Sequence, residues 1–220
     1  MTDGDAPIET TPSTIGHTIR RWARWYDLVS WIISLGRIGR VRRTATRIAQ
    51  LEPDISVLDI GCGTGSLALG LHQSVGAGGQ VSGIDASPEM IDVARNKAAG
   101  RGAPIDFRLG TAENLPYAEG QFDRVVSTFV FHHLPAALKR DVVDEIGRVL
   151  KPTGSVLIVD FAVGGGPLLH RLAAMLLGGH SHAGAAELTR LLEEAGFEGV
   201  SKVQTDHRGV DFVRGHRPAD

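Results

Sequence analysis

Cysteine is almost absent from this chain of 220 residues, since Cys62 stands alone. One thiol cannot close an internal disulfide, and it excludes every metal site that is built from several cysteines. Long apolar runs are also missing, because no stretch reaches the roughly 20 apolar residues of a membrane-spanning helix. Residues 1–17 are polar and acidic, which is unlike a secretory signal. We therefore expect a disordered tail there and a cytoplasmic protein.

Aromatic residues make up only 5% of the chain, and their distribution is uneven. All three tryptophans (Trp22, Trp25 and Trp31) fall in a segment where residues 20–47 contribute eight arginines against one acid, Asp27. This composition fits a solvated arginine face on helices whose tryptophans pack on the main domain. It also fits a basic, aromatic helix that rests on an anionic membrane surface or grips an acidic substrate.

Glycine, by contrast, is abundant at 28 residues, which indicates tight turns or close approach of the backbone to a ligand. From residue 51 onward, short apolar runs alternate with helical stretches, and this pattern predicts βαβ units. The fold class we expect is α/β: a doubly wound, Rossmann-like, mostly parallel sheet of seven strands in a single domain. The expected strands are 56–60, 80–84, 105–109, 124–129, 155–161, 197–204 and 209–214, and the expected helices are 18–35, 39–49, 66–73, 88–99, 136–150 and 185–195.

Local signals divide this domain further. Ser87 followed by Pro88 is typical of a helix start, and Lys151–Ser155 predicts a turn before a strand. The last two apolar runs lie too close together for a parallel return, so they must form an antiparallel hairpin that ends the sheet. We expect a tail at 1–17, a helical cap at 18–50, a cofactor-binding core at 51–161, a segment at 162–184 that is either a buried helix or a mobile lid, and a C-terminal helix and hairpin at 185–220.

The stretch VLDIGCGTGSLALGL, residues 57–71, places three glycines directly after the first expected strand. Their G-x-G-x-G spacing differs from the dinucleotide fingerprint G-x-G-x-x-G, and no G-K-[ST] is present for a phosphate-binding P-loop. Asp59, two residues before Gly61, would repel a pyrophosphate but suits a cation. Asp85 ends the second expected strand, where a carboxylate accepts ribose hydroxyls. The pattern predicts an adenosine ligand with a cationic, phosphate-free tail.

Five motifs follow one another along the chain: VLDIGCGTG, GIDASPEM, GTAENLPY, FDRVVSTFVFHHL and RVLKPTGSVLIVDF. In this order and spacing the chain resembles class I S-adenosylmethionine-dependent methyltransferases, above all the small-molecule branch with the ubiquinone and menaquinone C-methyltransferases. The resemblance is strong over residues 51–161, and RWARWYDLVSWIISLG is similar to the segment that precedes the core in that branch. It implies S-adenosyl-L-methionine (SAM) as methyl donor and S-adenosyl-L-homocysteine as product.

The resemblance also implies a cofactor site. Asp59 would anchor the loop and face the methionine ammonium, and Asp85 would accept the ribose hydroxyls. The Ala112 amide would meet an adenine nitrogen, while Thr111 stands where many relatives carry Asp or Asn for the adenine amino group, a contact that Glu113 would partly replace. The other implied residues are Gly61, Gly63, Thr64 and Gly65 at the methionine part, Ala86 and Met90 near the adenine, Ser127 and Thr128 after the fourth strand, and Tyr26 folded over the cofactor.

His132 and His133, just beyond the fourth strand, are the candidate catalytic residues. Methyl transfer mainly requires an acceptor that is held in line, and a general base is needed only if the acceptor must lose a proton. Histidine suits that role, with His133 slightly favoured by the resemblance; alternatively, one ring packs inward and the other faces solvent. The glycine-flanked His180 and His182 have no neighbouring ligand residues, so no metal is expected.

The leading hypothesis is a methyltransferase that acts on a small, apolar, quinone-like or phenolic acceptor. An enzyme that methylates phospholipid amines at a membrane surface, through the Arg- and Trp-rich segment, is the alternative. A nicotinamide-dependent reductase would need the later third glycine of the dinucleotide fingerprint, which this chain lacks. The intact glycines and aspartates argue against a non-catalytic binding module. No [DNS]-P-P-[YFW] tetrapeptide follows the fourth strand, so we expect no nucleic-acid substrate. Monomer and homodimer both remain open.

Overall fold

The computed structural model describes residues 37–162 and 184–219. Several predictions lie outside these ranges: the tail, the first expected helix with its tryptophans and Tyr26, and the segment 163–183 with His180 and His182. Among the helices of the described ranges, none is both long enough and apolar enough to cross a membrane.

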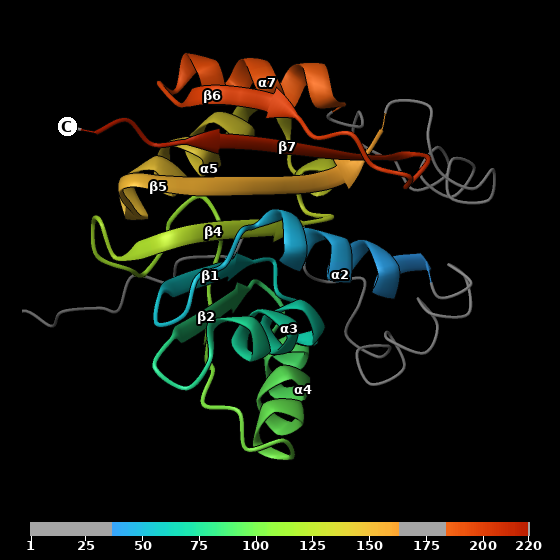
Figure 1. The fold of residues 1–220 in the computed structure, drawn as a ribbon, viewed down its shortest axis with the longest axis vertical. Helices are drawn as coiled ribbons and strands as arrows, with labels where there is room; N and C mark the ends of the chain where they lie inside the picture. Colours follow the sequence, from blue (N-terminus) through green and yellow to red (C-terminus); the bar gives the residue numbers. More distant parts are fainter. Residues whose placement is uncertain (1–36, 163–183, 220) are drawn as a thin grey trace, which may run out of the picture.

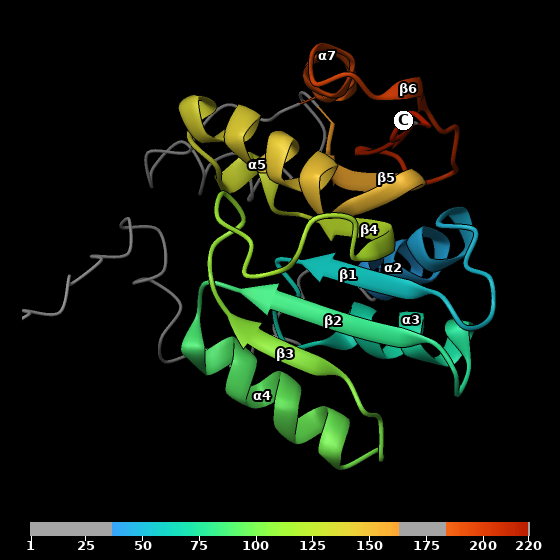
Figure 2. The same cartoon turned by 90° about the vertical axis from the view of Figure 1, so that its left-hand side faces the viewer.

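Seven strands form one sheet in the order β3-β2-β1-β4-β5-β7-β6. Five of them are parallel: β1 (Ser56–Ile60), β2 (Gln80–Asp85), β3 (Asp106–Leu109), β4 (Phe122–Thr128) and β5 (Leu150–Phe161). Strand β7 (Val210–His216) runs antiparallel to β5 and to β6 (Glu198–Lys202). Figure 1 shows β5 and β7 pointing in opposite directions, and Figure 2 shows β1, β2 and β3 pointing the same way. The predicted α/β sheet with its terminal antiparallel hairpin is confirmed.

Helices cover both faces of the sheet, with α2 and α3 in front of it and α5 behind it in Figure 1. One core packs α2 (Arg37–Ile48), α3 (Ser66–Val75) and α4 (Pro88–Ala99) against the sheet. The other packs α5 (Ala136–Val149) and α7 (Ala185–Glu194) against the opposite face. Because successive side chains of a strand alternate between faces, Val57 belongs to the first core and Leu58 and Ile60 to the second. Asp59 therefore points toward α2 and α3.

The start of α4 agrees with its sequence signal. The Met90 N–H donates to Ser87 Oγ over 3.3 Å, and Pro88 occupies the first turn, where its missing N–H costs nothing. This cap places Asp85, two residues earlier, at the carboxyl end of β2.

The turn predicted at Lys151–Ser155 is wrong, because β5 already begins at Leu150, which pairs with Phe122 of β4. The register shifts after this pair, and Thr153 has a φ of 63°. The chain therefore bends within the strand instead of leaving it, as at a β-bulge, and α5 leads into β5 without a connecting loop.

Candidate cofactor site

The loop after β1 holds its three glycines in the left-handed region, with φ of 68° at Gly61, 53° at Gly63 and 74° at Gly65. Only glycine adopts this conformation without strain. A Cβ at Gly61 would overlap the Val130 side chain, and one at Gly65 would lie 2.8 Å from the Phe107 ring. A Cβ at Gly63 would meet nothing within 4 Å, so the loop borders open space at its centre.

Asp85 holds this loop. Its Oδ2 accepts the Gly63 N–H over 2.8 Å, and its Oδ1 accepts the Ser87 N–H over 2.9 Å. Burial raises the pKa of Asp85, while these two backbone hydrogen bonds oppose that shift. Each carboxylate oxygen has a second lone pair that can accept a hydroxyl proton. Asp85 thus ties the glycine loop to β2 and keeps the capacity to bind a diol.

Asp59 lies on β1 and is fully buried, and among the residues that the structure describes neither of its carboxylate oxygens has a hydrogen-bond partner. Burial, assisted by the charge of Asp85, raises the pKa of Asp59 to about 7, against the opposing effects of Arg42 and of the Ala68 backbone. Asp85, rather than Asp59, makes the hydrogen bond to the loop. A buried carboxylate without a partner is costly, so Asp59 marks a place where a ligand cation would be stabilised.

The residues expected around the adenine follow β2 and β3. Ala86 is exposed and Met90 is buried, whereas Thr111, Ala112 and Glu113 are half-buried. The Gly110 N–H donates to the Asp85 carbonyl over 3.1 Å, which holds the start of this turn beside β2. The structure thus brings these residues together along one edge of the sheet.

Two residues that the sequence did not single out also lie here. Leu109 ends β3 beside Asp85 in the β2–β3 register, and its exposure of 54% is unusual for a large apolar side chain. Lys97 reaches from α4 to donate to Thr64 Oγ1 and Ser66 Oγ, both over 3.0 Å. The exposed Leu109 side chain offers apolar surface on which a ring can pack. Lys97 holds the end of the glycine loop through its two hydrogen bonds.

The end of β4 closes the site from the other side. Ser127 is buried and donates its hydroxyl to the Ile60 carbonyl over 3.3 Å, while Thr128 is half-buried at the strand end. Phe129 follows with a φ of 61°, a conformation that bulky residues rarely adopt and that costs roughly 1–3 kcal/mol. The left-handed conformation of Phe129 turns the chain so that the Val130 side chain packs on Gly61.

His132 and His133 lie next, in the 3-10 helix η2 (Phe131–His133). His132 Nδ1 is 2.7 Å from Oδ1 of Asp160, a fully buried residue of β5. Asp160 also accepts the backbone N–H of His132 over 3.0 Å and that of Phe161 over 2.7 Å. The His133 ring lies 3.8 Å from the His132 ring, and His133 is exposed. The structure therefore fixes His132 by a buried carboxylate that the sequence reading did not pair with it.

Comparison with known proteins agrees with this arrangement. A protein-family model described as a methyltransferase domain matches residues 57–154, from β1 into β5. The chain is 35% identical over 147 residues to the demethylmenaquinone methyltransferase of Desulfitobacterium hafniense (strain Y51), a match that covers 66% of this chain and 57% of that protein. The chain belongs to the class I S-adenosylmethionine-dependent methyltransferases. Enzymes of this family use SAM as their methyl donor, and the buried Asp59 carboxylate fits the cationic methionine ammonium of SAM.

Solved structures share the fold. A SAM-dependent methyltransferase from Aquifex aeolicus superposes with a TM-score of 0.67 at 23% identity, covering 80% of this chain and 89% of that one. The [4+2]-cyclase SpnF gives a TM-score of 0.68 at 21% identity, covering 82% of both chains. Because one fold carries both of these names, the acceptor and the reaction must be argued from the residues of the site. The aligned part spans only 57% of the curated relative, so that relative's activity is a starting point for a proposal.

Proposed function

We propose that this protein transfers the methyl group of SAM to a small, apolar acceptor with a quinone- or phenol-type ring. The observation that carries the cofactor part is the buried Asp59 carboxylate, which has no partner in the described part of the chain and lies beside the glycine loop. The similarity to a demethylmenaquinone methyltransferase supports the ring acceptor. When bound, SAM supplies a methyl group that is already activated by the positive charge on its sulfur.

The chain's own residues bind and orient. Asp59 would face the methionine ammonium and balance its charge, and the remaining lone pairs of Asp85 would accept the ribose hydroxyls. Leu109 and Met90 would give the adenine apolar surface, with the Ala112 amide at its edge. Thr128, at the end of β4, would border the methionine part. These roles use the residues that the motifs select, together with Leu109.

His132 would act as the general base. With the proton on Nδ1, His132 donates a hydrogen bond to the Asp160 carboxylate, and this tautomer leaves Nε2 as the proton-accepting nitrogen of the neutral ring. A phenol-type acceptor gives its hydroxyl proton to Nε2, and the imidazolium that forms is stabilised by the Asp160 charge. The acceptor then carries the electron density that a methyl transfer requires. Asp160 is a positioning residue in this scheme, because it acts through His132.

Calorimetric titration tests the cofactor part. We expect SAM to bind the native protein and NADH not to bind it, and Asp59→Asn to weaken SAM binding at least tenfold. Asp92→Asn is the matched control, since it removes an exposed carboxylate from α4. Binding of NADH alone, or unchanged SAM affinity in the Asp59 variant, would overturn this part of the proposal.

A transfer assay with tritium-labelled SAM tests the acceptor. A demethylated naphthoquinol, a simple phenol and phosphatidylethanolamine in detergent are offered side by side, and the products are identified by mass. We expect label in the ring compounds. Label in phosphatidylethanolamine alone would replace the proposed acceptor by a lipid amine while leaving the cofactor assignment intact.

A further inference from the structure

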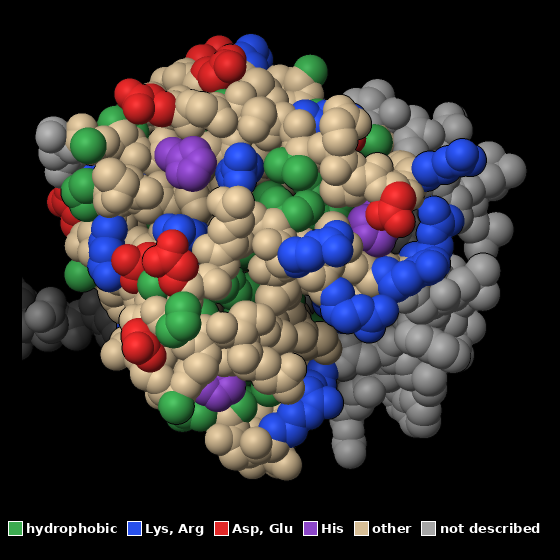
Figure 3. Space-filling model, viewed as in Figure 1, with side chains coloured by type: hydrophobic (Ala, Val, Ile, Leu, Met, Phe, Trp, Pro, Cys, Tyr) green, Lys and Arg blue, Asp and Glu red, His purple; other side chains and the backbone are tan. Residues whose placement is uncertain are grey.

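One face of α2 carries four arginines: Arg37, Arg40, Arg43 and Arg47. Their spacing of three, three and four residues places them along one side of an α-helix, and all four are exposed. The opposite side buries Val41, Thr44 and Ala45 against the sheet. Figure 3 shows Lys and Arg side chains gathered over α2 on this face of the molecule. The helix therefore presents a line of positive charge about 15 Å long to solvent.

Within the described ranges none of the four arginines forms an ion pair, and the α2 sequence contains no acid. The arginines of α5 behave differently: Arg140 pairs with Asp144 over 2.9 Å, and Arg148 with Glu145 over 2.6 Å. Surface arginines of this protein can thus be neutralised by neighbours along the same helix. On α2 the charge stays available to a partner.

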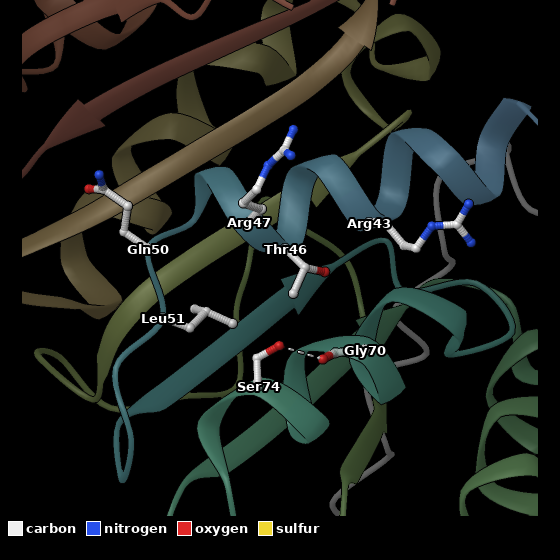
Figure 4. Close-up of a pocket in the computed structure, with 7 residues that line it drawn as sticks. All are labelled: Arg43, Thr46, Arg47, Gln50, Leu51, Gly70 and Ser74. Carbon is white, nitrogen blue, oxygen red and sulfur yellow. Dashed lines mark hydrogen bonds between the residues drawn. The ribbon is translucent and has the colours of Figure 1, made fainter.

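A groove of about 480 Å³ runs between α2 and α3 beside these arginines. Figure 4 shows the Arg43 and Arg47 guanidinium groups pointing in different directions, while Thr46 and Leu51 point toward α3. Two diverging guanidinium groups do not converge on a single phosphate. They suit an extended anionic surface on which each arginine contacts a different phosphate.

The placement of α2 relates this surface to the site. In Figure 1, α2 begins at the edge of the sheet toward which β5 points. Thr44 Oγ1 lies 2.9 Å from Nε2 of His207, in the turn before β7, and Val210 at the start of β7 pairs with Phe161 at the carboxyl end of β5. The arginine face therefore extends from the edge that carries the candidate cofactor site.

We propose that Arg37, Arg40, Arg43 and Arg47 form a docking surface for an anionic lipid bilayer. Each basic residue near an anionic leaflet strengthens binding by about fivefold, so four of them support reversible association. The net charge of −2 for the whole chain makes a general affinity for polyanions a weaker explanation than one local surface. The docking itself does not rest on the proposed function. Only the further step, in which the bilayer supplies an apolar acceptor to the site, rests on it.

Vesicle flotation with the full chain, without SAM or acceptor, tests the docking. Vesicles of phosphatidylcholine with phosphatidylglycerol are compared with vesicles of phosphatidylcholine alone, at low and at high salt. We expect binding only to the anionic vesicles, and loss of that binding at high salt as the charges are screened. Arg43→Gln with Arg47→Gln should weaken it by about 25-fold, and Arg43→Lys with Arg47→Lys should largely keep it.

The matched control is Arg101→Gln with Arg190→Gln, which removes the same charge from two exposed positions outside α2. Equal weakening by both double variants, or no binding of the native chain to anionic vesicles, would overturn the proposal. Tighter binding to a short duplex DNA than to the vesicles, lost with Arg43 and Arg47, would assign the surface to nucleic acid instead. SAM titration of the same variants should be unchanged, which separates a failed docking proposal from a failed cofactor assignment.

Discussion

The His132 and His133 ring centroids lie 3.8 Å apart with the ring planes tilted by 42°, yet only His132 is held by the buried Asp160. A general base contributes about 10²- to 10⁴-fold to a rate. We therefore expect His132→Gln to lower kcat by a factor in this range, while His133→Gln lowers it less than tenfold. SAM affinity, measured by calorimetry, should stay the same in both. An equal or larger loss at His133 would remove His132 from this role.

Asp160 has a test of its own, because it acts only through His132. Asp160→Asn keeps the shape of the side chain but favours the wrong tautomer of His132. We expect kcat to fall and the pH–rate profile to change shape, because a neutral amide no longer holds the proton on Nδ1 of His132, with little change in KM for SAM. A profile that keeps its shape at a uniformly lower rate would indicate a purely structural role for this carboxylate.

Burial raises the pKa of Asp59 to about 7, so the folded protein binds this proton more tightly than the unfolded chain does. The contribution of Asp59 to stability is therefore highest below pH 3.8 and falls as the pH rises to about 7. Asp59→Asn avoids this loss. We expect the ligand-free variant to be more stable than the native protein at pH 8, by a few kcal/mol in urea unfolding, and equally stable near pH 4. Asp92→Asn should show no such pH-dependent difference, and a less stable Asp59 variant at pH 8 would contradict the assignment.

Arg217, beyond the end of β7, joins the chain terminus to the end of α5. Its Nη1 donates to the carbonyls of Leu150 and Gly147 over 2.5 and 3.2 Å, and its backbone N–H donates to the Gly154 carbonyl over 2.8 Å. A guanidinium that satisfies carbonyls at a helix end stabilises both elements.

Arg217→Ala should therefore cost about 1–2 kcal/mol and lower Tm by roughly 2–8 °C in calorimetry. Arg217→Lys keeps the charge without the planar fork, so it should lie between the native protein and the alanine variant. Arg101→Ala, at an exposed position in the turn after α4, should leave Tm within about 1 °C. Equal Tm values for the two alanine variants would show that this link adds nothing to stability.

At the level of elements, the sequence was most informative where the signal is local. Strand β1 and helix α4 have the predicted bounds, because an apolar run before a glycine and a Ser-Pro cap are contained in a few residues. The start of β5 was missed since Leu150 enters the sheet through its pairing with Phe122, and no local pattern distinguishes that bend from a turn.

The site shows the same limit. Asp59, Asp85 and the glycines are marked by their spacing, but Asp160 lies inside the apolar run VLIVDF and resembles a strand end. Its contact with His132 spans 28 residues and exists only because β4 and β5 pair in parallel. Lys97 reaches Thr64 over 33 residues in the same way. Long-range pairs of this kind depend on the packed sheet and cannot be found from periodicity alone.

On the scale of the whole molecule, the seven-stranded sheet separates two apolar cores, yet every strand shares a hydrogen-bonded ladder with its neighbour. The two cores pack on opposite faces of the same strands, because β1, β4 and β5 contribute side chains to both. The two cores should therefore unfold in one cooperative transition.

Leu71→Ala empties space under α3 in one core, and Ile146→Ala does so under α5 in the other; both side chains are fully buried. Each substitution should cost about 2–5 kcal/mol, and the double variant should show a nearly additive loss in a single calorimetric transition. SAM at 100 times its Kd should raise that one transition by about 2.7 kcal/mol in the native protein and in both single variants. Two separate transitions would show that the cores unfold independently. Protection by SAM of the Ile146 variant but not of the Leu71 variant would show that ligand binding at the glycine loop stabilises only one core.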